Sequence, residues 1–171
     1  MYKIGELIVK ANIGVCRVVD FLQPHLDIRG IDKNKWYYQL IPIEDEKTKI
    51  YIAVDDVHID IRKIMTKEDA AEQIEQISAL EVLRFADERI REQTYKKIIK
   101  ENDPKELLRM LKTIYLRKKE REAQGKKQTT VDENYSKLAE QFLFSELCVV
   151  LEKSREEIYE CIWTSLNKNN D

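Results

Sequence analysis

Apolar and polar residues alternate in short runs along the first third of the chain. In the run 49–54 the isoleucines alternate with Tyr51 and Ala53. Period-two alternation places one set of side chains on a core face and the other on an outer face. Similar apolar runs, separated by turn signals, cover 4–10, 15–21, 36–43 and 57–61. The pattern predicts five short strands in a closed or nearly closed antiparallel barrel, with Pro42 at an edge or a bulge.

The rest of the chain has the three-to-four-residue apolar spacing of amphipathic helices. Helix starts are marked by residues such as Asp103, which precedes Pro104, and Ser154, which Glu157 follows three positions later. The cap side chain accepts an otherwise unpaired backbone N–H, and the carboxylate reaches back to the cap. Two further caps are predicted at Thr66 and Thr130, and the five predicted helices cover 67–79, 81–100, 104–122, 131–151 and 155–167.

Composition agrees with this division. The chain has 171 residues, of which 43% are apolar, so one large or two small folded domains are expected and disorder is not. Four glycines and three prolines are too few for a turn-dense β-sandwich or a glycine-rich phosphate-binding enzyme. We therefore predict an α+β fold, with a small antiparallel β-barrel over 1–63 and an all-α domain of about five helices over 64–171.

Catalytic and metal-binding signatures are missing from the sequence. It contains no nucleotide-binding loop, no nucleophile elbow and no metalloprotease motif. Neither His25 nor His58 lies beside a cysteine, so we expect no metal site. The cysteines are odd in number, widely spaced and set among apolar residues, which favours core packing in a reducing compartment (Cys16, Cys148 and Cys161). We expect a protein that is not an enzyme, without catalytic residues, cofactor or small-molecule ligand.

Charge is distributed unevenly along the chain. The formal net charge is −2, but residues 84–127 carry 15 Lys+Arg against 8 Asp+Glu, whereas residues 128–171 carry 4 against 9. A local basic segment beside acidic ones can hold phosphates while limiting unspecific binding elsewhere. The same segment is equally typical of a solvated helix face whose cations complement helix C-termini. No base-reading motif is present, so backbone contact is the most that this segment predicts.

The order of several short motifs resembles the CarD-like family of bacterial transcription factors. The motifs span its strands and its helices, and together they cover essentially the whole chain (2–9, 12–15, 36–40, 50–55, 116–121 and 139–147). The resemblance implies a Tudor-like or SH3-like N-terminal domain that docks on the β subunit of bacterial RNA polymerase. It also implies a helical domain that contacts promoter DNA at the upstream edge of the transcription bubble and stabilises the open complex.

The resemblance also guides the choice of site residues. The candidate DNA contacts are all basic and lie in or beside the second and fourth predicted helices (Arg84, Arg89, Arg91, Lys96, Lys126 and Lys127). The family has a tryptophan early in its second helix that wedges against the minor groove, and here Asp87 or Glu88 stands at that position. The candidate polymerase contacts are Arg17 and three residues of one predicted strand that face away from the predicted core (Lys49, Tyr51 and Ala53), among which Tyr51 is the first choice.

Two functions from different classes follow from these observations. In the first, the chain is a transcription regulator, and docking on polymerase makes a weak intrinsic DNA affinity sufficient. In the second, it is a polymerase-bound adaptor whose helices bind another protein instead of DNA. For both we expect a monomer in the cytoplasm, associated with the nucleoid, without a signal peptide or a membrane span.

Overall fold

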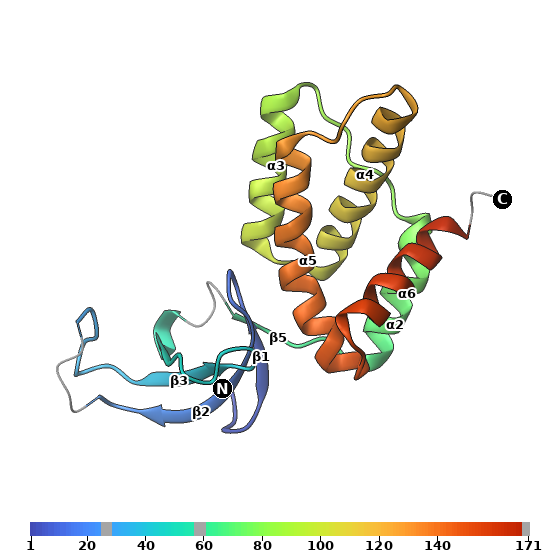
Figure 1. Ribbon diagram of the computed structural model, residues 1–171. Helices are drawn as coiled ribbons and strands as arrows, with labels where there is room; N and C mark the ends of the chain where they lie inside the picture. Colours follow the sequence, from blue (N-terminus) through green and yellow to red (C-terminus); the bar gives the residue numbers. More distant parts are fainter. Residues whose placement is uncertain (25–28, 57–60, 169–171) are drawn as a thin grey trace. The chain divides into compact units, whose positions relative to one another are not determined.

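The structure is a computed structural model that describes residues 1–24, 29–56 and 61–168 (Figure 1). The chain divides into two compact units, Met1–Ile64 and Met65–Asp171, which we call the sheet unit and the helical unit. The boundary lies one residue from the expected one. All described strands lie in the first unit and all described α-helices in the second, which confirms the α+β class.

Five short strands make up the sheet unit in the described part of the chain. They are β1 (Leu7–Lys10), β2 (Gly14–Leu22), β3 (Tyr37–Pro42), β4 (Ile50–Ala53) and β5 (Ile61–Lys63), and a short 3-10 helix, η1 (Val54–Asp56), follows β4. Their order is β4-β3-β2-β1-β5, and all neighbours are antiparallel. The sheet curls into a half-barrel (Figure 1) instead of closing, so β4 and β5 are its edges among these residues. Most of the strand predicted at 57–61 falls outside the described residues.

The predicted alternation in β4 is present in the sheet. Ile50 and Ile52 face the core of the half-barrel, together with residues of the three preceding strands (Ile8, Cys16, Val18, Tyr38 and Leu40). The strand register pairs Gln39 with Tyr51, which places Tyr51 on the opposite, outer face. Pro42, expected at an edge or a bulge, is the last residue of β3, and the bulge lies instead in β2, between Val18 and Asp20.

Five α-helices form the helical unit over residues 65–168. They are α2 (Lys67–Glu75), which continues into the 3-10 helix η2 (Gln76–Ala79), α3 (Glu88–Glu101), α4 (Pro104–Ala123), α5 (Thr130–Leu151) and α6 (Arg155–Asn167). The N-caps at Thr66, Asp103 and Ser154 are confirmed, because each side chain accepts a backbone N–H from the third helical residue. For α5 the predicted cap is wrong by one residue, since Thr129 caps the helix.

The largest correction concerns the helix predicted over 81–100, which begins only at Glu88. The Asp87 carboxylate caps it, accepting the Ile90 N–H at 2.8 Å. Ahead of the cap, Leu83 and Phe85 pack against the helical core without forming a helix. The segment is held by α4, where the Lys112 ammonium donates to two backbone carbonyls, of residues 78 and 80, at 2.6 Å each. Lys112, which a count of charges along the sequence treats as a surface cation, therefore fixes the chain ahead of α3.

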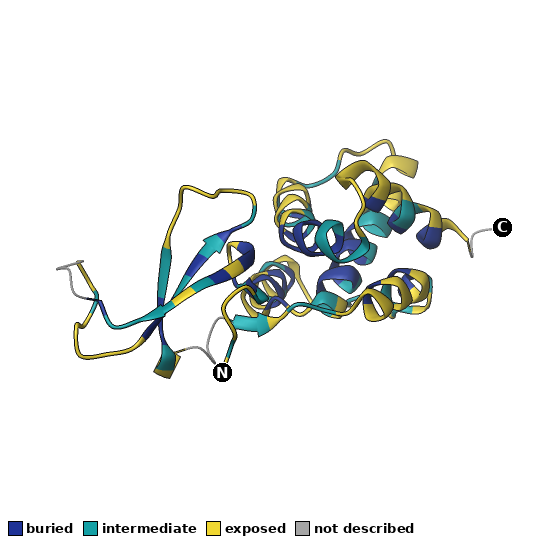
Figure 2. Cartoon of the chain, turned by 90° about the horizontal axis from the view of Figure 1, so that it is seen from below, coloured by how far each residue is buried: buried dark blue, intermediate teal, exposed yellow. Residues whose placement is uncertain are grey.

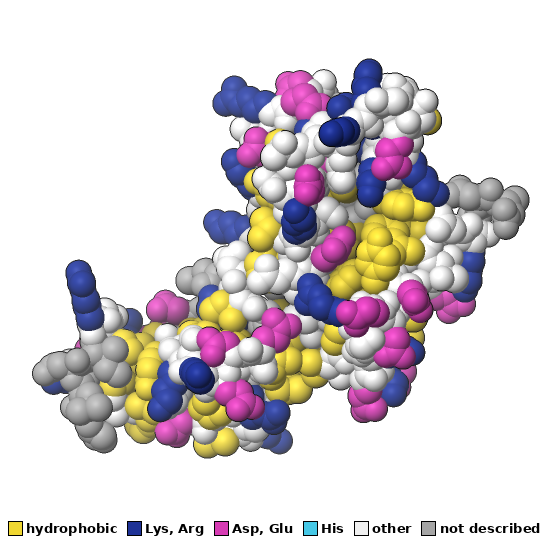
Figure 3. All heavy atoms as spheres, viewed as in Figure 1, with side chains coloured by type: hydrophobic (Ala, Val, Ile, Leu, Met, Phe, Trp, Pro, Cys, Tyr) yellow, Lys and Arg dark blue, Asp and Glu magenta, His cyan; other side chains and the backbone are white. Residues whose placement is uncertain are grey.

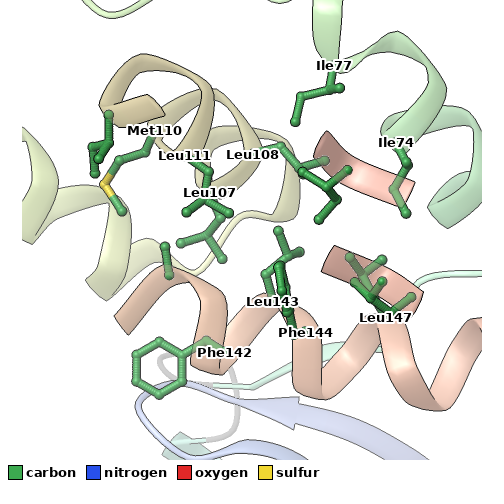
Figure 4. Packing of buried hydrophobic residues seen from close by; sticks show 14 of the residues in the cluster. Ile74, Ile77, Leu107, Leu108, Met110, Leu111, Phe142, Leu143, Phe144 and Leu147 are labelled. Carbon is green, nitrogen blue, oxygen red and sulfur yellow. The ribbon is translucent and has the colours of Figure 1, made fainter. Parts of the chain in front are cut away.

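The helices bury their apolar stripes against one another and expose their polar faces (Figure 2). The centre of this core is made by α4 and α5, whose leucines interdigitate (Figure 4), including Leu107, Leu111 and Leu143. Cys148 and Cys161 are partly buried against the same core, and Cys16 is buried in the sheet unit. None of the three cysteines is in a disulfide bond, as their spacing predicts.

Candidate partner-binding and nucleic-acid interfaces

Three of the four candidate polymerase contacts lie on or just before β4, an edge strand among the described residues, and Arg17 lies on β2, an inner strand. Lys49 is exposed just before β4, and Tyr51 is half-buried on the outer face of that strand. The register pairs Arg17 with Ile41 and Gln39 with Tyr51, so exposed Arg17 shares the outer face with Tyr51. Ala53 is only 7% exposed, and its side chain is therefore not offered to a partner.

Trp36 is a surface residue beside the edge strand β4. It is 49% exposed immediately before β3, and its ring stacks on Phe21 with centroids 4.9 Å apart and planes 11° from parallel. Its carbonyl accepts the Val54 N–H at 3.0 Å, which fixes Trp36 beside the end of β4. Its neighbours Tyr37 and Tyr38 are buried. The sequence signal for exposure is the position of Trp36 at the junction between a polar turn and the strand.

Of the six candidate DNA contacts, five are exposed and one is not. Within the described residues, the exposed Arg84 and Arg89 side chains make no hydrogen bond or ion pair. Lys96 pairs with Glu92 one helical turn away at 3.0 Å, and this hydrogen bond and the carboxylate charge raise the Lys96 pKa. Part of the charge of Lys96 is therefore already neutralised.

Lys126 and Lys127 lie in the loop between α4 and α5, which backbone and side-chain bonds hold against the end of α4. The Lys126 N–H donates to the Arg121 carbonyl at 2.8 Å, and Arg121 Nε donates to the Lys127 carbonyl at 2.7 Å. Gly125 supplies the positive φ of 71° that turns the chain there, which glycine adopts without a steric penalty. Both lysine side chains are exposed.

Arg91 is the exception, because its side chain is only 2% exposed. Its guanidinium contacts the Glu88 carboxylate, and its Nε lies 3.6 Å from an oxygen of Asp132, whose side chain is 1% exposed. Arg117 Nε donates to the other Asp132 oxygen at 3.3 Å. Arg91 therefore does not belong to an exposed basic surface. It is part of a buried ion network that joins α3, α4 and α5.

A tyrosine completes this network. Tyr95, one turn along α3 from Arg91, is fully buried and donates its hydroxyl to Asp132 at 3.1 Å. Burial and the Asp132 charge raise the pKa of Tyr95 well above its usual value, so the hydroxyl stays a donor. The network brings the start of α3, the second half of α4 and the start of α5 together at one end of the helical unit (Figure 1).

Exposed cations at this end of the helical unit are mixed with carboxylates. Lys118 reaches Glu122 at 4.0 Å, and Lys137 pairs with Glu133 at 2.7 Å. Figure 3 shows the same interspersion over the helices on the face that it presents. The basic excess of residues 84–127 therefore does not form one continuous cationic surface on that face, and Arg84, Arg89, Lys126 and Lys127 are the cations best placed to hold phosphates.

No protein-family model and no curated protein matches this chain. The described residues contain no group of three or more His, Cys, Asp or Glu side chains arranged to hold a metal ion. Among the same residues, no helix combines the length and the apolar character that crossing a membrane requires.

Proposed function

We propose that the chain is a transcription regulator that docks on the β subunit of RNA polymerase through its sheet unit and holds promoter DNA with its helical unit. The observation that carries the proposal is the free edge at β4, flanked by exposed Lys49 and Trp36, in a chain whose motif order resembles CarD-like factors. In this proposal the half-barrel is the Tudor-like or SH3-like domain of that family.

Docking uses the edge of the half-barrel. In the described part of the chain β4 pairs only with β3, so the backbone groups on its other side remain for a partner strand. Addition of a strand there supplies main-chain hydrogen bonds, and neighbouring side chains supply specificity. Tyr51 and Arg17 on the outer face, and Trp36 beside the end of β4, are the side chains that contact polymerase.

The helical unit contacts the DNA backbone near the upstream edge of the bubble. Arg84, Arg89, Lys126 and Lys127 make these contacts, and the paired Lys96 makes a weaker one. Such contacts position a protein without reading sequence, and docking raises their local concentration. The regulator is a monomeric, nucleoid-associated, cytoplasmic protein and has no catalytic activity.

A second candidate function is the polymerase-bound adaptor, in which the helices bind a protein. Two observations favour it. Arg91, half of the family-like basic pair, is buried. Two positions correspond to the family's wedge tryptophan. One is Asp87, the N-cap of α3, and the other is Glu88, so a carboxylate stands at either position.

Charge reversal separates the two functions. We expect Arg84→Glu with Arg89→Glu to shorten the lifetime of open promoter complexes, while pull-down of the chain with the polymerase β subunit stays unchanged. Lys100→Glu with Lys105→Glu is the matched control, because these exposed lysines lie where α3 ends and α4 begins, at the opposite end of the helices. Equal lifetimes for both double variants and the native chain would favour the adaptor. Failure of the native chain to bind the β subunit would exclude both.

A further inference from the structure

A surface carboxylate covers two arginines at the DNA-facing end of the helical unit. Glu88 is the first residue of α3, and its side chain is 75% exposed. It accepts a hydrogen bond from Arg91 Nη1 at 3.0 Å, contacts Arg91 Nη2, and lies 3.7 Å from Arg117 Nη2. An exposed side chain therefore supplies the outer partner of two guanidinium groups.

The inner partner of the same two arginines is a buried carboxylate. Asp132 lies 3.6 Å from Arg91 Nε and 3.3 Å from Arg117 Nε, and it is fully buried. Two cations thus face one buried anion, and Glu88 balances the charge that remains. The buried Arg91 Nε has no hydrogen-bond partner, so the network is incompletely satisfied even with Glu88 in place.

The covered arginines border a groove between residues 82–88 and α4. Arg84, Arg91 and Arg117 are among its lining residues. The groove also includes Asp87, whose carboxylate is engaged as the N-cap, and Glu120. The first backbone N–H groups of α3 lie at the same place, and a helix N-terminus favours anions. Arginines at a helix start form the donor set that binds a phosphate group.

We propose that the Glu88 carboxylate occupies a backbone-phosphate site, made by Arg117, Arg91 and Arg84, and that a DNA phosphate takes its place on binding. A phosphodiester carries the same single negative charge as the carboxylate and accepts the same forked donors. Because Glu88 is exposed, it can turn into solvent, while Asp132 keeps both arginines paired. The proposal rests on the proposed function for the identity of the ligand, and it adds Arg117 to the DNA-binding residues.

Removal of the Glu88 charge tests the competition. We expect Glu88→Gln to tighten binding of the full chain to a short DNA duplex and to leave the log–log salt dependence unchanged, because the same phosphate is neutralised in both chains but no charged side chain has to be displaced. Glu133→Gln is the matched control, since Glu133 is an exposed carboxylate in the first turn of α5 that pairs with Lys137 and not with either arginine. Equal effects of the two substitutions would overturn the proposal, because they would reflect net charge alone.

Two further measurements separate this proposal from the proposed function. Adding Arg117→Gln to Glu88→Gln is expected to abolish the gain, and a preserved gain would overturn the site. Inorganic phosphate, titrated into the full-length Glu88→Gln variant, is expected to shift the arginine side-chain NMR signals of Arg91 and Arg117 more than in Glu133→Gln. This phosphate titration needs no polymerase and no promoter. If the NMR signals shift but the Arg84→Glu with Arg89→Glu variant leaves the lifetime of open promoter complexes unchanged, the phosphate site stands and the proposed function fails.

Discussion

The two units differ in where they keep their polar groups. Tyrosines apart, the sheet unit buries only apolar side chains among its described residues, whereas every buried polar or charged side chain lies in the helical unit (Arg91, Asn102, Thr113, Asp132, Ser145, Glu146 and Ser165). Backbone hydrogen bonding explains part of the contrast. A sheet satisfies its backbone groups between neighbouring strands, while helix ends and connecting segments leave backbone groups that side chains can satisfy.

The helical unit uses its buried polar groups for this purpose. The Glu146 carboxylate accepts the Met65 N–H at 2.8 Å, which holds the chain as it enters α2. Thr113 accepts the Leu83 N–H at 2.9 Å, and Arg91 with Asp132 ties α3 to α5. Basic residues in the helical unit therefore divide into those that hold the fold and those that stay exposed. In the sheet unit, the ring of Trp36 stays exposed beside the edge strand β4.

The largest expected effect comes from removing the buried carboxylate of the helical unit. Asp132→Ala leaves Arg91 buried with only the exposed Glu88 as a partner and removes the acceptor of the Tyr95 hydroxyl. Breaking a buried ion pair from one side costs about 3–5 kcal/mol of unfolding free energy. Urea unfolding followed by Trp163 fluorescence, in a Trp36→Phe background, measures the helical unit separately. A loss as small as that of Glu133→Gln would show that the network does not hold the helices together.

In the sheet unit the corresponding test uses the buried thiol. Cys16 is fully buried, and burial raises its pKa from 9.0 to about 11. The Cys16 thiol therefore holds its proton more tightly in the folded than in the unfolded chain. The contribution of this thiol to the free energy of unfolding is complete below pH 9 and is lost as the pH rises toward 11. At pH 8 we expect iodoacetamide to alkylate Cys16 at least about a hundredfold more slowly in the folded chain than in urea. Mass spectrometry of the labelled peptides measures both rates, and equal rates would contradict burial of Cys16 in an apolar core of the sheet unit.

At the surface of the sheet unit we expect Trp36 to dominate docking. An exposed tryptophan beside a free strand edge is typical of an interface hot spot, whose truncation costs about 2 kcal/mol or more of binding free energy. Trp36→Ala is therefore expected to weaken binding to the polymerase β subunit roughly thirtyfold. Ile4→Ala, at another exposed apolar side chain of the same unit, is the control. Titration calorimetry or surface binding gives both affinities, and comparable losses would mean that Trp36 is not the anchor.

The sequence pattern predicts most of the fold and less of the site. Alternation in 49–54 identifies the inner and outer faces of β4, and N-cap residues place the starts of α2, α4 and α6. The sequence pattern does not predict the start of α3, because two residues distant in sequence hold the chain after η2 outside a helix. Lys112 donates to the carbonyls of residues 78 and 80, and Thr113 accepts the Leu83 N–H. Propensity and periodicity are local signals and contain no information on such partners.

Burial of Arg91 has a sequence signal that charge counting overlooks. Arg91, Tyr95 and Ile98 are spaced by four and three residues, so Arg91 continues the buried stripe of α3. Asp132 stands seven residues before buried Ala139 on α5, which is also one face of a helix. Opposite charges on two apolar stripes predict a buried ion pair, while the total charge of residues 84–127 counts Arg91 as surface.

The smallest expected effect concerns an exposed carboxylate of the helical unit, where the contrast with Asp132 is sharpest. Glu157 accepts the Ser154 N–H at 2.8 Å in the capping box of α6, and this bond, followed by that to the Ser154 hydroxyl, lowers the Glu157 pKa below 4.5. A carboxylate whose pKa is lower in the folded state adds stability above pH 4.5, and this is lost as the pH falls through the folded value. Glu157→Gln keeps a capping acceptor but cannot titrate. Between pH 5 and pH 3 we therefore expect the thermal stability of this variant to fall slightly less than that of the native chain. Glu156→Gln, at a neighbouring exposed carboxylate, is the control. Identical pH profiles for the two variants would show that the cap does not depend on charge, unlike the Asp132 network, in which both arginines need an anion.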